Sequence, residues 1–239
     1  MTTGKGKKTK GKKNAATQFT GRGMATRVKT AKGRKSSSTR WLQRQLNDPY
    51  VAEAQARGYR SRAAFKLLEL NDRFDFLHKG QKIVDLGAAP GGWTQVIHEC
   101  LKQSDSKIVA VDQNEMEPHS GVTVLHLDIF EEDAPEQIRN ALGGPADVVL
   151  SDMAPSATGH RSTDHLRIIG LCEAALDIAN NILAPDGTFI AKAWQGGTEH
   201  DLLALIKRSF KQVKHAKPPA SRANSAEVYV VAQGFRGAS

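Results

Sequence analysis

One lysine lies in a stretch of sequence that is otherwise apolar. The segment GTFIAKAWQGG, residues 187–197, has the pattern of a short buried strand followed by a glycine turn, and it contains Lys192. A lysine is seldom fully buried without a partner, because leaving water disfavours its charge and lowers its pKa. Either this is an edge strand whose lysine stem reaches solvent, or Lys192 is a functional cation.

A glycine-rich turn is the second feature that could support chemistry. The segment VDLGAAPGGWTQV, residues 84–96, is typical of a strand that passes through a tight turn into a helix. Gly87, Gly91 and Gly92 would let the backbone approach a ligand closely at this turn. The spacing differs from the dinucleotide fingerprint, and Pro90 disfavours a pyrophosphate cradle.

Acidic residues close successive strand-like runs after this turn. Asp85 nearly closes the first run, Asp112 the second and Asp128 the third. Asp112 is placed to accept hydrogen bonds from a ribose diol, and Asp128 would lie near an adenine. Together with the glycine turn, they predict a site for an adenosine-containing cofactor without phosphates.

The elements that must position these residues alternate between strands and helices. Strand-like runs occur at 82–88, 107–112, 122–128, 146–152, 187–194 and 226–235, and helical patterns near 92–102, 133–142, 164–183 and 199–210. Such alternation predicts an α/β fold with a mostly parallel sheet covered on both faces. Residues 226–235 follow a Pro-Pro loop with no helix, so we expect this last strand to be antiparallel. Upstream, residues 41–74 predict a helix, a break at 47–49 and further helical turns.

The charge of the chain is unevenly distributed. The first 40 residues hold 13 Lys and Arg and no acid, so the other 199 hold 21 basic against 25 acidic residues. We expect residues 1–40 to be a disordered arm that binds RNA phosphates, and residues 41–239 to form the catalytic domain. No apolar run could span a bilayer, and Cys100 and Cys172 stand apart without metal-site spacing. We expect a soluble, monomeric, cytoplasmic protein without a membrane partner or a metal.

Five motifs extend over most of residues 41–235: SRAAFKLLEL, VDLGAAPGGWTQV, SDMAPSATG, FIAKAWQG and AEVYVVAQGF. Together they resemble one family, the FtsJ-like ribosomal RNA 2′-O-methyltransferases. The resemblance implies a Rossmann-like methyltransferase fold that uses S-adenosylmethionine, with a mostly parallel seven-stranded sheet and an antiparallel final strand.

The resemblance also implies roles for particular residues. Those that would contact the cofactor are Gly91, Trp93, Asp112, Asp128 and Asp152, beside Gly87 of the glycine turn. The family's catalytic Lys-Asp-Lys-Glu tetrad falls on Lys66, Asp152, Lys192 and Glu227. The activity implied is methylation of a uridine ribose in large-subunit (23S) ribosomal RNA, within the assembled subunit.

Two roles are open for Lys192 in such a site. In the first, burial and the second ammonium of Lys66 lower its pKa, and Lys192 is the general base that accepts the proton of the ribose 2′-hydroxyl. In the second, Lys192 stays protonated and holds the hydroxyl in line while the proton leaves to water. Asp152 and Glu227 favour the charged form.

The RNA contacts are expected from local basic segments that flank the predicted active-site edge. Candidates are Arg57, Arg60, Arg62 and Lys66, the basic residues Lys207, Arg208, Lys211, Lys214, Lys217 and Arg222 of the segment 207–222, and the aromatic residues Trp41 and Tyr59 as stacking surfaces. Three alternatives stay open: a transfer RNA 2′-O-methyltransferase, a ribosome-assembly factor that retains the fold without turnover, and a small-molecule methyltransferase.

Overall fold

The computed structural model describes residues 36–155, 161–194 and 199–237. The chain divides into two compact units, residues 1–49 and 50–239. The described part of the first unit is helix α1 (Ser36–Leu46), after which the Asn47 side chain donates to the Gln43 carbonyl (2.6 Å). The expected break at 47–49 is found at residues 47 and 48, since Pro49 begins the next helix, and the expected boundary at 40/41 falls inside α1. Most of the basic arm lies outside the described residues.

The second unit holds the alternating elements. Its helices are α2 (Pro49–Arg57), α3 (Ala64–Phe74), α4 (Gly92–Cys100), α5 (Ala134–Leu142), α6 (Arg161–Ile182) and α7 (Glu199–Ser209). Its strands are β1 (Lys82–Leu86), β2 (Lys107–Asp112), β3 (Thr123–His126), β4 (Ala146–Ser151), β5 (Leu183–Trp194), β6 (Phe210–Ala216) and β7 (Glu227–Phe235). None of the described helices has both the length and the apolar character needed to cross a membrane.

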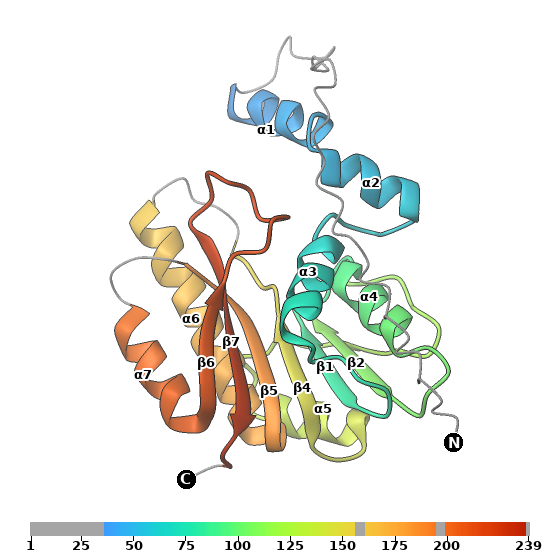
Figure 1. The fold of residues 1–239 in the computed structure, drawn as a ribbon, viewed down its shortest axis with the longest axis vertical. Coiled ribbons are helices and arrows are strands. Elements are labelled where there is room, and N and C mark those ends of the chain that lie inside the picture. Colours follow the sequence, from blue (N-terminus) through green and yellow to red (C-terminus); the bar gives the residue numbers. More distant parts are fainter. Residues whose placement is uncertain (1–35, 156–160, 195–198, 238–239) are drawn as a thin grey trace, which may run out of the picture. The chain divides into compact units, whose positions relative to one another are not determined.

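The strands form one seven-stranded sheet in the order β3-β2-β1-β4-β5-β7-β6 (Figure 1). Strands β1 to β5 pair in parallel, and β7 is antiparallel to both β5 and β6. The predicted fold class, with its antiparallel final strand, is confirmed. The strand order reverses between β1 and β4, so a ligand is expected beyond their carboxyl ends, at the upper edge of the sheet in Figure 1.

Strand β6 is an element that the sequence pattern did not predict. Its residues, FKQVKHA, are mostly exposed, and it pairs only with β7 at the border of the sheet. Polar and lysine-rich sequence is common on edge strands, where it discourages pairing with other chains. The sequence of β6 therefore shows little of the apolar and polar alternation from which a strand is predicted.

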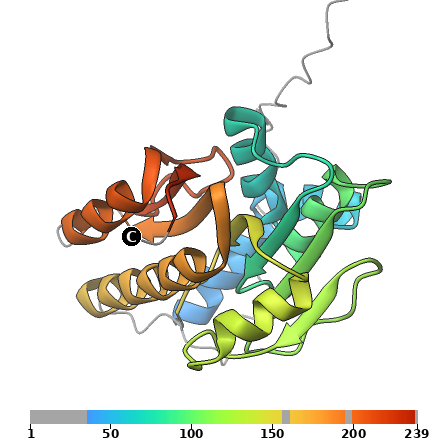
Figure 2. The same ribbon diagram turned by 90° about the horizontal axis from the view of Figure 1, so that it is seen from below.

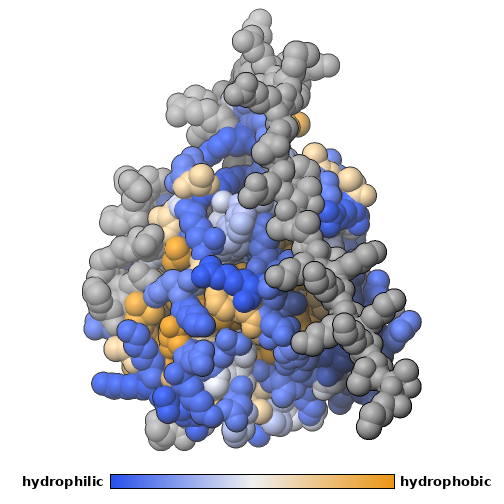
Figure 3. Space-filling model, viewed as in Figure 1, coloured by the Kyte–Doolittle hydropathy of each residue, from blue (hydrophilic) through white to orange (hydrophobic). Residues whose placement is uncertain are grey.

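Helices cover both faces of the sheet (Figure 2). One core joins α5, α6 and α7 to inward side chains such as Val149 and Phe189. The other joins α3 and α4 to the opposite face, through residues such as Ile190 and Tyr229. The surface seen in Figure 3 is largely hydrophilic, with hydrophobic side chains gathered near its middle.

Candidate active site

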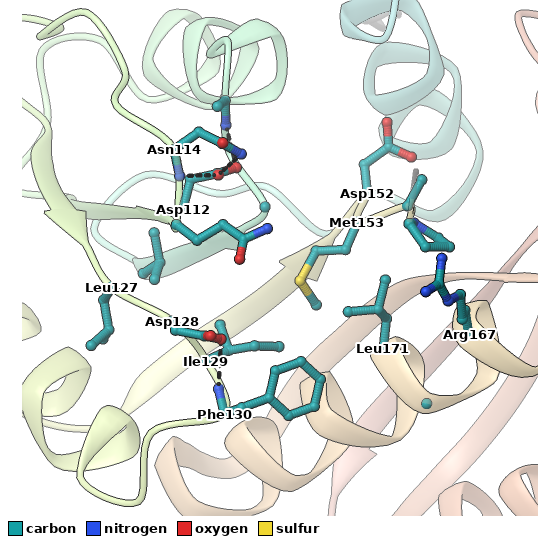
Figure 4. Close-up of a pocket in the computed structure, with 17 residues that line it drawn as sticks. Asp112, Asn114, Leu127, Asp128, Ile129, Phe130, Asp152, Met153, Arg167 and Leu171 are labelled. Carbon is teal, nitrogen blue, oxygen red and sulfur yellow. Dashed lines mark hydrogen bonds between the residues drawn. The ribbon is translucent and has the colours of Figure 1, made fainter. Parts of the chain in front are cut away.

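A cavity of about 750 Å³ opens beyond the carboxyl ends of β1, β2 and β4. This is within the usual range of cofactor pockets. Figure 4 shows Asp112, Asn114 and Leu127 on one side of it, Met153 and Arg167 on the other, and Ile129 and Phe130 between them. Polar groups thus stand beside an apolar wall, the combination that a nucleoside requires.

The glycine turn lies at the rim of this cavity. Gly87 has φ +72°, and a Cβ there would come within 2.3 Å of Met153 Cγ, so a side chain is excluded. Asp112 Oδ2 accepts the Ala89 N–H (3.0 Å), and its Oδ1 accepts the Asn114 N–H (2.8 Å). Asp112 therefore fixes the turn, and its remaining acceptor positions suit a ribose diol.

Of the expected cofactor residues, Gly87, Asp112, Asp128 and Asp152 line the cavity. Asp128 lies two residues beyond the end of β3, not at its last residue, and accepts the Phe130 N–H (3.1 Å). Apolar wall residues such as Phe130 and Met153 were not predicted, although each follows one of these acids within two positions.

Gly91, Trp93 and Asp85 are not among the residues that line the cavity. The Trp93 indole is buried; its N–H donates to the Ala63 carbonyl (2.8 Å) because the ring packs between α3 and the sheet. The Trp93 ring is therefore not part of the cavity wall, whereas its backbone N–H lies in the first turn of α4, where amide groups have no partner within the helix. Asp85 is buried and accepts a hydrogen bond from the Thr94 hydroxyl (2.7 Å). Its burial, and to a smaller extent the negative charges of Asp152 and Asp112, raise its pKa to about 7.

The structure brings the four expected catalytic residues together. Lys192 Nζ lies 2.7 Å from Asp152 Oδ1 and 3.7 Å from Glu227 Oε2. Lys66 Nζ lies 2.8 Å from Glu227 Oε1 and 3.6 Å from Asp152 Oδ1. Two ammonium groups and two carboxylates thus alternate in one compact cluster.

Local structure explains this convergence. Lys66 lies in the first turn of α3, Asp152 directly after β4, Lys192 near the end of β5 and Glu227 at the start of β7, all at the same edge of the sheet. Strand β5 lies between β4 and β7, and Lys192 is only 9% exposed. The edge-strand explanation of this lysine is therefore wrong.

Asp152 links the cluster to the cavity. It lines the cavity, whereas its carboxylate points toward α3 in Figure 4, where Lys66 lies. Its backbone carbonyl also accepts from Lys192 Nζ (2.8 Å). A group bound in the cavity and a group held by Lys192 would therefore be neighbours.

The proton states of the cluster follow from its charges. Burial would lower the pKa of Lys192, but Asp152 and Glu227 outweigh it and raise that pKa above its ordinary value. Burial would likewise raise the pKa values of Asp152 and Glu227, but the two ammonium groups hold both below the usual range. The cluster therefore rests with both carboxylates ionised and Lys192 protonated.

Two further residues complete the network and were not predicted. The Tyr229 hydroxyl donates to Asp152 Oδ1 (2.5 Å) and accepts from Lys66 Nζ (3.1 Å), and the Ser221 hydroxyl donates to Glu227 Oε1 (2.8 Å). Tyr229 stands two positions after Glu227 on β7, hence on the same face, which was the available signal. Ser221 lies in a loop and offered none.

The expected RNA-contacting residues before α3 have partners within the protein. Arg57 pairs with Glu53 (2.6 Å), and Arg62 donates to the Ala220 carbonyl (2.5 Å). Tyr59 donates to Glu99 (2.8 Å) and meets Phe65 edge-on, so its ring is part of the packing. The Trp41 side chain lies outside the described part of the structure.

The basic segment 207–222 was expected to flank the active-site edge, but only part of it lies there. Strand β6 runs from the end of the sheet opposite the active site to the active-site end. Lys211, early in this strand, pairs with Asp186 near the start of β5, away from the cluster. Lys217, beyond the end of β6, is at the active-site edge, where it donates to the Ser225 carbonyl (2.5 Å).

A doubly wound sheet with a nucleoside-type cavity beside a Lys-Asp-Lys-Glu cluster defines an S-adenosylmethionine-dependent methyltransferase. The model of the FtsJ-like methyltransferase family matches residues 59–235, and the chain belongs to this family. S-adenosylmethionine is the methyl donor of its members.

Similar proteins agree with this assignment. A protein of Paramagnetospirillum magneticum named ribosomal RNA large subunit methyltransferase E is 58% identical, with 100% of both chains covered. A protein of the same name from Xanthobacter autotrophicus is 57% identical over 91% of this chain and 86% of its own. A Plasmodium falciparum crystal structure described as a ribosomal RNA methyltransferase has 31% identity and a TM-score of 0.69, covering 75% of this chain and 100% of that one.

Proposed function

We propose that this chain transfers a methyl group from S-adenosylmethionine to the 2′-hydroxyl of a uridine ribose in large-subunit ribosomal RNA, within the assembled subunit. The observation that carries the proposal is the cluster of Lys66, Asp152, Lys192 and Glu227 beside the cavity. The names of the similar proteins support the choice of substrate.

The cavity fits the cofactor. At Gly87 only a glycine leaves room, Asp112 offers acceptor oxygens to the ribose, and the apolar wall around Ile129 and Phe130 can cover an adenine. Asp128 would accept from the adenine amino group, and the backbone after Gly91 would contribute N–H donors. When bound, S-adenosylmethionine supplies a methyl group already activated by its sulfonium.

Lys192 acts in its protonated form. Two carboxylates lie 2.7 and 3.7 Å from its Nζ and raise its pKa, so Lys192 would have to lose a proton before it could serve as a base, which favours the second of its two expected roles. As an ammonium held by Asp152, it donates a hydrogen bond to the ribose 2′-oxygen and fixes that oxygen near the cavity. The hydroxyl proton then leaves to water.

The other members of the cluster keep Lys192 in place. Asp152 holds it through both its carboxylate and its backbone carbonyl. Lys66 anchors Glu227, and Tyr229 bonds both Lys66 and Asp152, so the four charged side chains cannot rotate independently. The charge pairs restrict the ribose to one orientation, which is the main requirement of an in-line transfer.

Transfer of a tritiated methyl group tests the substrate class. Large ribosomal subunits, naked ribosomal RNA and transfer RNA are offered separately, and the labelled nucleoside is identified by mass spectrometry. We expect 2′-O-methyluridine from the large subunits. If the label appears mainly on transfer RNA, then transfer RNA is the substrate instead of ribosomal RNA. If no RNA is labelled although the cofactor binds, an assembly factor or a small-molecule methyltransferase is favoured.

The pH dependence of single-turnover transfer tests the role of Lys192. A protonated Lys192 predicts a rate that does not rise between about pH 6 and 9. Asp85 has a pKa of about 7, so an Asp85→Asn variant is the control for its titration. A rate that rises tenfold per pH unit in both proteins would restore the general-base role.

A further inference from the structure

Arg60 connects three segments around the cofactor cavity. Its Nη1 donates to the Glu117 carbonyl (2.8 Å) and to the Pro90 carbonyl (3.4 Å), and its Nη2 donates to the Pro118 carbonyl (3.0 Å). Its own backbone N–H is held by the Gln95 side chain of α4 (2.7 Å). One guanidinium therefore joins the segment before α3 to the glycine turn and to the loop 113–120.

Both of the segments that Arg60 joins belong to the cavity. The glycine turn contributes Gly87 and Ala89, and the loop 113–120 begins with Gln113 and Asn114, directly after Asp112. The loop has no helix or strand of its own. Its position therefore depends on side-chain contacts, and those of Arg60 hold its middle.

The packing at Gly91 shows how close this contact is. Gly91 has φ +107°, and a Cβ built there would lie 2.7 Å from Arg60 Nη1 and 3.2 Å from Met116 Sδ. The guanidinium thus fills the space over the glycine turn, against a side chain of the loop 113–120. The side chains of Arg60 and Met116 therefore meet over Gly91, which has no side chain of its own.

We propose that Arg60 is a positioning residue for the cofactor: it clamps the loop 113–120 onto the glycine turn and thereby keeps Asp112 and Asn114 in the arrangement that binds S-adenosylmethionine. The inference rests on the cofactor site proposed above. It assigns Arg60 to cofactor binding, whereas its position in a basic segment suggested RNA contact.

The contacts favour the clamp over an RNA contact. The Arg60 side chain is 20% exposed, and its donors face backbone carbonyls, whereas the Arg57 side chain is 48% exposed. Arg57 lies three positions earlier, pairs with Glu53 and lies over the Phe65 ring. The two arginines carry the same charge in the same segment, so Arg57→Met is a matched control for Arg60→Met.

The first measurement is the Kd for S-adenosylmethionine by calorimetry, without RNA. If loss of the clamp leaves the loop correctly placed about a tenth of the time, the Kd of Arg60→Met rises about tenfold. Arg60→Lys, whose ammonium cannot reproduce the fork of the guanidinium, should show a smaller rise. Arg57→Met should stay within about twofold of the unchanged protein. In steady-state transfer, Arg60→Met should raise the KM for S-adenosylmethionine by more than it changes kcat.

Two readouts separate positioning from a general loss of structure. Amide hydrogen exchange at 113–120 should be faster in Arg60→Met and unchanged in Arg57→Met. The salt dependence of RNA binding should be the same for Arg60→Met as for the unchanged protein, whereas a lost phosphate contact would lower its slope by about 1.

An unchanged cofactor Kd in Arg60→Met overturns the clamp. If Asp112→Ala weakens cofactor binding in the same experiment, only the clamp is wrong; if Asp112→Ala also has no effect, the proposed cofactor site is wrong. Should Arg60→Met not fold, Arg60→Lys decides, and an unchanged Kd for that variant overturns the proposal.

Discussion

Replacing Lys192 by methionine removes one ammonium from the cluster and keeps a side chain of similar length. Asp152 then loses its 2.7 Å partner and the donor to its backbone carbonyl. It keeps the Tyr229 hydroxyl at 2.5 Å and the Lys66 ammonium at 3.6 Å. The buried carboxylate of Asp152 then has fewer hydrogen bonds and less positive charge nearby to offset the cost of its burial.

The expected cost follows from this geometry. Removing one member of a buried ion pair costs about 3–5 kcal/mol. Because two partners of Asp152 remain, we expect a loss at the lower end of this range: the free energy of unfolding at pH 8 should fall by about 3 kcal/mol. Loss of the hydrogen bond to the substrate should also reduce the rate of methyl transfer at least 100-fold, roughly the size of one well-placed catalytic group.

The stability cost should depend on pH. The folded-state pKa of Asp152 is lowered, so its contribution is present above its unfolded pKa and is lost as the pH falls through the folded value. In Lys192→Met that pKa is higher, so the carboxyl is protonated at a less acidic pH. The cost of the substitution should therefore be smaller at pH 5 than at pH 8.

Urea unfolding followed by circular dichroism at both pH values measures this cost. Lys211→Met is the control, because it removes the same charge from the ion pair with Asp186, whose side chains are 55% and 73% exposed. Such an exposed pair contributes at most about 1 kcal/mol. A cost for Lys192→Met no larger than that of the control, and equal at the two pH values, would refute the reasoning.

Three further changes test other parts of the site. Gly87→Ala should weaken S-adenosylmethionine binding at least tenfold in calorimetry, because its Cβ would collide with Met153, and an unchanged Kd would contradict the tight turn. Tyr229→Phe should slow single-turnover transfer about tenfold, since Asp152 loses a hydrogen bond, and a rate equal to that of the unchanged protein would remove Tyr229 from the network. The pKa of Asp85 is raised to about 7, so its contribution is present below the unfolded value and is lost as the pH rises toward 7. Asp85→Asn should therefore gain stability relative to the unchanged protein from pH 5 to pH 7, by roughly 1.4 kcal/mol per pH unit at most, and a pH-independent difference in urea unfolding would contradict the shift.

The central strands and their polar ends were predictable from the sequence. The runs that form β1, β2 and β4 are mostly apolar, and each ends with or is followed by an acid or a glycine, so Gly87, Asp112 and Asp152 could be placed at one edge. Parallel strands buried on both faces have this continuous apolar pattern, which is hard to mistake for a surface element. The convergence of Lys192 on Asp152 follows from the same topology.

Partners that lie far apart in the chain were not predictable. The sequence shows that Arg60 is charged, but only the fold shows that its donors meet the carbonyls of Glu117 and Pro118. The direction of the Trp93 ring depends on α3, which packs over it, and the proton state of Lys192 depends on how closely two carboxylates approach. These are tertiary contacts, to which local sequence pattern is blind.

The role of Lys192 in ribose methylation is best measured by single-turnover methyl transfer to large ribosomal subunits, with S-adenosylmethionine binding determined on the same preparations. The unchanged protein and Lys192→Met are compared. We expect 2′-O-methyluridine from the unchanged protein and at least a 100-fold slower reaction from Lys192→Met, with similar cofactor Kd values for both proteins. Equal rates in the two proteins, or a methyl group on a base instead of a ribose, would contradict this role.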